Sequence, residues 1–296
     1  MTQDQYRGCL LGLASGDALG APYEGGFLEH CLWRLIGRTA AGEARWTDDT
    51  QMTLDLAESL LAHMPLDQAD LARRFANSYR WRRGYGPGAA RVLKRIRKGQ
   101  DWQTAARAVY PQGSFGNGAA MRAPVLALFF ADDVALLAAA HASAEVTHGH
   151  PLAIAGAQLM AISTKCLLQR QSIAEVLTAL DNLNLPDDFT RRLQLTRQWL
   201  ATGSKPGPAE VARSLGNGMT AATSCVTALY IALRHLECGF EQMMDFVIGC
   251  GGDVDTLGAM AGALWGVRNG AQALPQLKIE AWDQIDQLAQ RIFHSH

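Results

Sequence analysis

Two segments near the ends of the chain carry glycine at every fourth position. A glycine inside a helix costs about 1 kcal/mol relative to alanine, so a stripe of glycines needs a compensating gain. Close approach of two helix backbones supplies that gain, since no side chain holds them apart. We therefore predict two central helices that bring the ends of the chain together in the core; a chance spacing is the alternative. The stripes are Gly8, Gly12, Gly16 and Gly20, and Gly258, Gly262, Gly266 and Gly270.

Helical patterns dominate the whole sequence. Alanine and leucine are abundant, and few stretches alternate polar and apolar residues. The prolines fall almost wholly between the predicted helices or at their starts. Hydrophobic residues make up 48% of the 296 residues, which is enough for a large core. The one linker-like stretch, residues 201–210, is short and lies between helical patterns, so we predict one all-α domain over residues 1–296.

Charge and cysteine content indicate the kind of protein and its partners. The net charge is −1 with acids and bases interspersed, so we expect neither nucleic acid nor a membrane surface as a partner. The start "MTQDQYRGCLLGLASGD" has an acid before its short apolar run and no basic start, unlike a signal peptide, and no uncharged apolar run reaches the roughly 18 residues of a membrane span. We expect a cytoplasmic monomer with reduced, buried thiols, because no CxxC pair occurs among Cys9, Cys31, Cys166, Cys225, Cys238 and Cys250.

The stretch "WTDDTQM" at residues 46–52 is the first candidate for chemistry. It places Thr47, Asp48 and Asp49 just before a helix predicted over residues 50–63. Taken alone, the stretch is a good helix start, with either Asp48 as the N-cap and Gln51 completing a capping box, or Thr47 at the head of the helix. Acidic residues in a first turn also suit the helix dipole. The same side chains are half of a metal site if a second acidic cluster lies beside them.

Such a cluster exists near the C-terminus in "GCGGDVDTLGAM". It holds Asp253, Asp255 and Thr256 at another predicted helix start, with no lysine or arginine in its neighbourhood. Carboxylates and threonine hydroxyls are hard oxygen donors that suit Mg²⁺, Mn²⁺ or Ca²⁺ rather than zinc. If the clusters meet, repulsion among their carboxylates raises the pKa values, and two divalent cations would relieve it. An EF-hand loop and the "DxDxT" start of aspartyl-phosphate phosphatases fit the spacing less well.

Three further stretches are candidates for ligand contact. The loop "GSFGNGAAMRAP" at residues 113–124 can offer backbone N–H groups to a phosphate. It lacks the Gly-Lys-Ser/Thr of a P-loop, and a plain turn is the alternative. "THGHP" holds His148 and His150, which are substrate contacts or helix-cap residues. "APYEGG" places Glu24 just past the first glycine-striped helix, where it matters only if the acidic clusters lie beside it.

Taken in order, these stretches resemble the ADP-ribosylglycohydrolase family. The resemblance runs through "RGCLLGLASGDALGAPYE", "WTDDTQM", "SFGNGAAMR", "THGHP" and "GCGGDVDTLGAMAGALWG", and so spans nearly the whole chain. It implies an all-α fold, a compact single-domain orthogonal helical bundle with a binuclear Mg²⁺ or Mn²⁺ centre in a cleft. The implied metal ligands are Thr47, Asp48, Asp49, Asp253, Asp255 and Thr256.

The resemblance also implies roles for the other stretches. Glu24 matches a glutamate that lies over the metals as a gate or base in some members, so the implied catalytic carboxylates are Glu24, Asp49 and Asp253. Some arginine-type members carry an additional acid after the third helix, but "YRWRRGYGPGAAR" has none; its glycines and Tyr85 are expected to line the adenosine side. The implied substrate-binding residues, in the diphosphate loop and beyond it, are Ser114, Phe115, Gly116, Asn117, Gly118 and His148.

The implied activity is hydrolysis at C1″ of the distal ribose, which releases ADP-ribose from an acceptor on a protein or a small molecule. We favour protein arginine as the acceptor, with serine, a modified nucleic acid or a free ADP-ribose derivative as alternatives. The rival classes are a metal-dependent phosphohydrolase and a catalytically silent protein that binds ADP-ribosylated targets or neutralises a toxin. A binding protein alone would not need the full set of acidic ligands.

Overall fold

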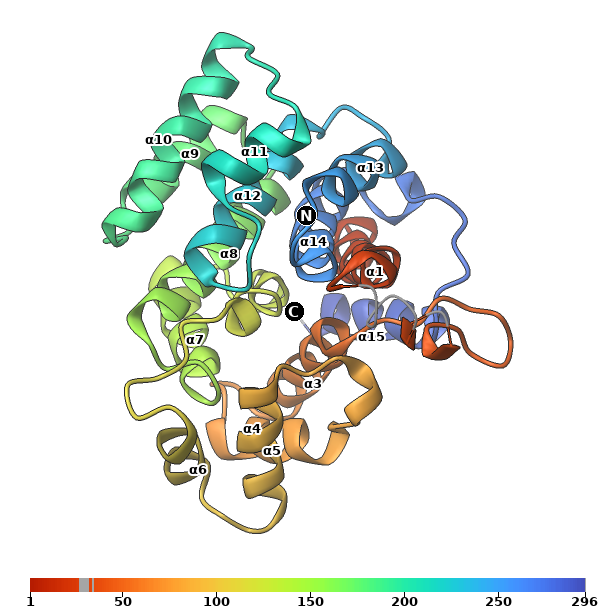
Figure 1. The fold of residues 1–296 in the computed structure, drawn as a ribbon, viewed down its shortest axis with the longest axis vertical. Helices are drawn as coiled ribbons and strands as arrows, with labels where there is room; N and C mark the ends of the chain where they lie inside the picture. The colour runs from red at the N-terminus through yellow and green to blue at the C-terminus, as the bar shows by residue number, and fades with distance from the viewer. Residues whose placement is uncertain (27–31, 34, 296) are drawn as a thin grey trace.

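Helices make up nearly all of the regular structure in the computed structural model, which describes residues 1–26, 32–33 and 35–295. Within that part of the chain only isolated β-bridges occur outside the helices, so the all-α prediction is confirmed. Figure 1 shows the α-helices, which are α1 (Gln3–Gly20), α3 (Asp48–Ala62), α4 (Gln68–Ser78), α5 (Pro87–Arg97), α6 (Trp102–Val109), α7 (Asp133–Glu145), α8 (Pro151–Leu168), α9 (Ile173–Asp181), α10 (Asp187–Thr202), α11 (Pro208–Leu215), α12 (Ala221–Arg234), α13 (Phe240–Cys250), α14 (Val254–Asn269) and α15 (Trp282–His294). Short 3₁₀ turns connect some of them, namely η1 (Ala21–Tyr23), η2 (Trp81–Arg83), η3 (Asn117–Ala119), η4 (Ala123–Leu128) and η5 (Ala271–Ala273).

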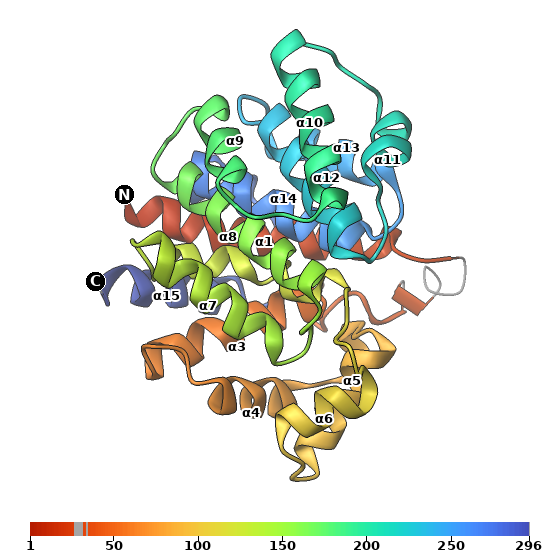
Figure 2. The ribbon, with the colours of Figure 1, turned by 90° about the vertical axis from the view of Figure 1, so that its left-hand side faces the viewer.

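The two glycine stripes lie against each other at the centre of the molecule. Helices α1 and α14 run antiparallel, so that Gly12 faces Gly262 and Gly16 faces Gly258. A Cβ added at any of these positions would overlap the carbonyl oxygen of the facing glycine. The prediction of two close, central helices is therefore confirmed. Figure 2 shows the pair side by side, with both chain termini on the same side of the molecule.

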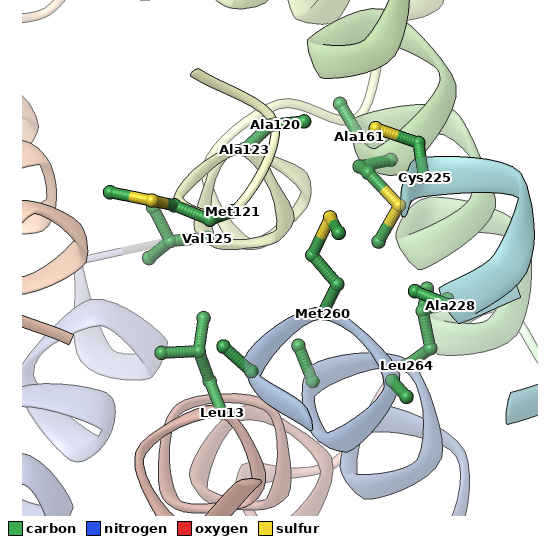
Figure 3. Close-up of a cluster of buried hydrophobic side chains, with 14 of the residues drawn as sticks. Leu13, Ala120, Met121, Ala123, Val125, Ala161, Cys225, Ala228, Met260 and Leu264 are labelled. Atoms are coloured by element: carbon green, nitrogen blue, oxygen red, sulfur yellow. The ribbon is translucent and has the colours of Figure 1, made fainter. Parts of the chain in front are cut away.

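Apolar side chains from five segments fill the space beside this pair. Figure 3 shows Leu13 of α1 and Met260 of α14 facing Val125 of η4, Ala161 of α8 and Cys225 of α12. Leu13 is 1% exposed, and the other four are fully buried. The small residues let the helices approach, and methionine fills the irregular gaps between them.

Helix α8 is an apolar helix of this core. By length and composition alone it could cross a membrane, but 72% of it is buried inside the molecule. At its end Lys165 pairs with Asp133 of α7 at 2.5 Å. Its apolar character is accounted for by burial against α7, α12 and α14.

The start of α3 differs from the predicted one. The helix begins at Asp48, and its N-cap is Thr47, whose hydroxyl accepts a hydrogen bond from the Asp49 N–H at 3.3 Å. Of the two predicted caps, Thr47 is therefore confirmed, and the capping box of Asp48 with Gln51 is wrong, because Gln51 instead donates to Asp55 at 3.3 Å. Threonine at the cap leaves the Asp48 and Asp49 side chains directed into a cavity rather than onto the helix end.

The cysteines in the described residues are free thiols, as predicted. Four are buried and Cys238 is partly exposed. Cys31 lies outside the described residues. Burial raises the pKa of Cys9 and of Cys225 to about 12, so both stay protonated and unreactive at neutral pH.

Candidate active site and metal centre

Helices α1, α3 and α14 converge at one end of the glycine contact, and this brings the two acidic clusters together. Gly20, the last residue of α1, packs on the backbone of Asp255 at the start of α14. Asp17 of α1 binds the start of α3. It accepts hydrogen bonds from the backbone N–H groups of Thr47, at 2.9 Å, and Thr50, at 3.0 Å. Clusters some 200 residues apart in the sequence therefore share one site.

Asp17 is a site residue that the sequence interpretation missed. It is fully buried and also accepts a hydrogen bond from the Thr50 hydroxyl at 2.6 Å. Burial raises the pKa of Asp17 to about 6, although these hydrogen bonds oppose the shift. The available signal was a lone acid in an otherwise apolar helix segment, which needs a partner once buried. Its partner is the backbone of a distant segment, so no local pattern pointed to it.

A cavity of about 250 Å³ opens where the three helices meet, and we call it the acidic cleft. The predicted site residues that line it are Glu24, Asp48, Asp49, Ser114, Phe115, Gly116, Asn117, Gly118, His148, Asp253, Asp255 and Thr256. Thr47 is buried at the cap of α3 and lines a second cavity of about 390 Å³, the side cavity, which shares Glu24 and Gly84 with the acidic cleft.

The expected adenosine side is only partly as predicted. Gly84, Gly86 and Gly88 do line the acidic cleft. Tyr85 lies in the wall of the side cavity instead, buried against the ring of Tyr79 with 4.9 Å between centroids. Gly84 and Gly86 line both cavities, whereas Tyr85 lines the side cavity alone.

The acidic cleft concentrates negative charge that protein groups alone do not balance. Burial, followed by the charges of neighbouring carboxylates, raises the pKa values of Asp48, Asp49 and Asp255 well above their ordinary range. Asp49 Oδ2 is buried without a hydrogen-bond partner in the described structure. Carboxylate oxygens of Glu24, Asp253 and Asp255 lie within 4.8 Å of one another, close enough to hold one ion.

This donor set fits a hard divalent cation, because it consists of oxygens only. The sequence interpretation gave Glu24 the role of a gate or base, whereas the structure groups it with two of the predicted ligands. Asn117 of the glycine-rich loop donates a hydrogen bond to Asp253 Oδ2 at 2.6 Å. The loop and the acidic cluster are therefore joined directly.

The glycine-rich loop is built around the histidine ring. A Cβ on Gly118 would overlap the imidazole of His148, and one on Gly116 would touch it at 3.4 Å. The second histidine has the alternative role: His150 caps α8 by accepting a hydrogen bond from the Leu152 N–H at 3.2 Å. Of the two histidines, His148 therefore lines the cleft and His150 caps a helix.

Comparison with known proteins agrees with this geometry. The sequence pattern of the family described as ADP-ribosylglycohydrolase matches residues 1–296. The chain belongs to the ADP-ribosylglycohydrolase family. It is therefore a hydrolase, and the family assignment drawn from the five sequence stretches is confirmed.

Relatives within the ADP-ribosylglycohydrolase family align over nearly the whole chain. A protein of Gallus gallus named ADP-ribosylhydrolase ARH3 is 34% identical over 328 residues, covering 95% of this chain and 88% of that protein. The Homo sapiens protein of the same name is 32% identical over 336 residues, covering 97% and 92%. A solved structure titled "ADP-ribosylglycohydrolase-related protein complex" superposes with a TM-score of 0.73 at 27% identity, covering 99% of this chain and 98% of that one.

We expect Asp49→Asn to stabilise the metal-free protein by an amount that grows with pH. Because the pKa of Asp49 is raised in the folded state, the folded protein keeps a proton there that the unfolded chain releases above about pH 4. The stability from this proton is present at low pH and is lost as the pH rises toward the folded pKa. Asparagine has no charge to gain, so in EDTA the melting temperatures should differ little near about pH 4.5 and by several degrees near about pH 8. A difference that stays constant with pH would contradict the electrostatic account.

Proposed function

We propose that this protein hydrolyses the glycosidic bond at C1″ of ADP-ribose attached to an acceptor, and so reverses mono-ADP-ribosylation. One observation carries the proposal: carboxylates from three segments, most of them buried, share a cleft with the glycine-rich loop and are joined to it by the Asn117–Asp253 hydrogen bond. The relatives named ADP-ribosylhydrolase support the same chemistry.

Two divalent cations, Mg²⁺ or Mn²⁺, belong to this proposal. The residues that would hold them are Thr47, Asp48, Asp49, Asp253, Asp255 and Thr256, and the short distances add Glu24 to this set. When bound, such ions lower the pKa of a bound water and orient the hydroxyls of the distal ribose. The buried, unpartnered Asp49 Oδ2 supports the fit, since a carboxylate oxygen in that position needs a cation or a donor.

The chain's own groups perform the remaining tasks. Glu24, Asp49 and Asp253 are the carboxylates that can accept a proton from the attacking water. Positive charge develops on the ribose as the C1″ bond breaks, and the surrounding carboxylates stabilise it. Backbone N–H groups of the loop 114–118 and the ring of His148 would bind the diphosphate. This remote binding energy holds C1″ against the carboxylates.

The proposed acceptor is protein arginine. Its guanidinium would face the carboxylate of Glu24, which lies in the wall of the side cavity. Serine is the second candidate because of Arg82. Among the described residues lining the side cavity, Glu24 and Arg82 carry the only charges. Arg82 would repel a cationic acceptor and leave a neutral serine unaffected.

A panel of defined substrates tests the proposed function. Peptides carrying ADP-ribose on arginine or on serine are incubated with and without Mg²⁺, and free ADP-ribose and inorganic phosphate are both measured. We expect release of ADP-ribose that requires Mg²⁺, without phosphate. Release of phosphate would point to a phosphohydrolase, and tight binding of both peptides without turnover would point to a binding protein.

We also propose a cytoplasmic monomer that acts without a membrane. The buried free thiols support the compartment, the near-zero net charge supports the absence of a membrane partner, and a monomer is the default. Light scattering of the purified protein measures the mass in solution and would reveal a dimer directly.

A further inference from the structure

Arg122 is a fully buried cation directly behind the glycine-rich loop. None of the ion pairs in the described part of the chain includes it. It donates instead to neutral acceptors, namely the carbonyl oxygens of Gly118 and Ser143 and the hydroxyl of Thr147, and it lies over the ring of Phe75 at 5.0 Å. The charge of Asp48 acts on Arg122 without a direct ion pair. Burying a guanidinium without a directly paired carboxylate is expensive, so its position calls for an explanation.

The hydrogen bonds of Arg122 lead to His148 through one hydroxyl group. Arg122 donates to Thr147 Oγ1 at 3.1 Å, and the same oxygen lies 2.8 Å from His148 Nδ1. A guanidinium can only donate, so Thr147 accepts that bond and keeps its own proton available. Among the hydrogen bonds of the described residues, His148 Nδ1 is the acceptor within reach of this proton. When Thr147 donates its proton to Nδ1, the imidazole proton is on Nε2.

The surroundings also keep the His148 ring neutral. Burial, and after it the charge of Arg122, lowers the pKa of His148 to about 3. Burial lowers the pKa of Arg122 only to about 9, so the guanidinium remains charged at neutral pH. The Nε2 side of the ring lies over the loop, where a Cβ on Gly116 would be 3.4 Å from Nε2. A neutral N–H donor and a positive charge behind it therefore both face the glycine-rich loop.

We propose that Arg122, acting through Thr147, fixes His148 as a neutral Nε2–H donor for an anionic oxygen of the ligand bound at the loop 114–118. Arg122 and Thr147 are positioning residues, and His148 makes the contact. The buried charge of Arg122 also favours an anionic ligand in a cleft whose other wall is acidic. That the ligand is a nucleoside diphosphate sugar rests on the proposed function.

The hydroxyl of Thr147 provides a matched pair of variants. Thr147→Val keeps the shape of the side chain and removes the donor to Nδ1, whereas Thr147→Ser keeps the donor. In ¹⁵N NMR spectra, with the His148 signal assigned by its loss in His148→Gln, the parent and Thr147→Ser should show a protonated Nε2 and an unprotonated Nδ1. Thr147→Val should show a mixture of the two tautomers. ADP-ribose binding should weaken by about tenfold in Thr147→Val and recover in Thr147→Ser, the size expected for one hydrogen bond to a charged group.

Two results would overturn the inference. The first is an Nδ1–H tautomer or an imidazolium in the parent protein at neutral pH, a measurement that needs no variant to fold. The second is equal affinity of the valine and serine variants for ADP-ribose. Neither readout requires turnover, so a protein with the Nε2–H tautomer and the expected affinities but no hydrolysis would contradict the proposed function alone.

Discussion

We expect Asp49→Ala and Asp255→Ala each to reduce the proposed release of ADP-ribose from a modified target by about a hundredfold to a thousandfold, the scale seen when a group that stabilises transition-state charge is removed. Asp49 stands in the first turn of α3 and Asp255 in the first turn of α14, and both line the acidic cleft. Each substitution removes a carboxylate that no neighbouring group can replace. Initial rates with saturating Mg²⁺ measure the effect, and EDTA should abolish the activity of the parent protein.

The control for this experiment is Asp245→Ala, which removes an exposed acid from α13 and should leave the rate unchanged. The melting temperature separates a variant that has lost its fold from one that has lost only its catalytic activity. Removing the charge of Asp49 relieves repulsion in the metal-free cleft, so this variant should melt no lower than the parent protein in EDTA. Full activity in either cleft variant would refute the assignment of the two acidic clusters.

The meeting of the acidic clusters was predictable because two independent patterns agreed. The glycine stripes predicted contact between the ends of the chain, and the aspartates at two helix starts predicted a metal site if that contact existed. The structure bears out the contact between Gly16 and Gly258 and places Asp48 and Asp253 in one cleft. Periodicity identifies such features because backbone contact along a helix repeats with the helix turn.

Other parts of the site could not be predicted, because their function depends on distant partners. Asp17 acts on backbone N–H groups of the segment before α3. Arg122 stood in the quoted stretch "SFGNGAAMR" without a role, since no pattern shows that an arginine will be buried without a carboxylate. The cap of α3 stayed open between Asp48 and Thr47 for a related reason: aspartate and threonine are both good caps, and only the structure shows that the aspartates line the cleft.

Gly16→Ala should destabilise the protein by more than about 4 kcal/mol, the range reserved for disruption of a packed core. The helix propensity of alanine alone would give the opposite sign, a gain of about 1 kcal/mol. In the structure, the added Cβ would overlap the carbonyl oxygen of Gly258, and backbone on both sides leaves no flexible side chain to move away. Urea denaturation followed by circular dichroism measures the change in the free energy of unfolding.

Gly207→Ala is the matched control, because it adds the same methyl group where no atom lies within 4 Å and φ is −73°. It should change stability by no more than about 0.5 kcal/mol. A Gly16→Ala variant more stable than the parent protein would mean that the glycines recur by chance and do not mark a contact between the two helix backbones. If the Gly16→Ala variant is destabilised but still folds, its affinity for Mg²⁺ gives a second test. The same contact sets the separation of α1 from Asp255, so its affinity for Mg²⁺ should fall together with its stability, whereas that of Gly207→Ala should not change.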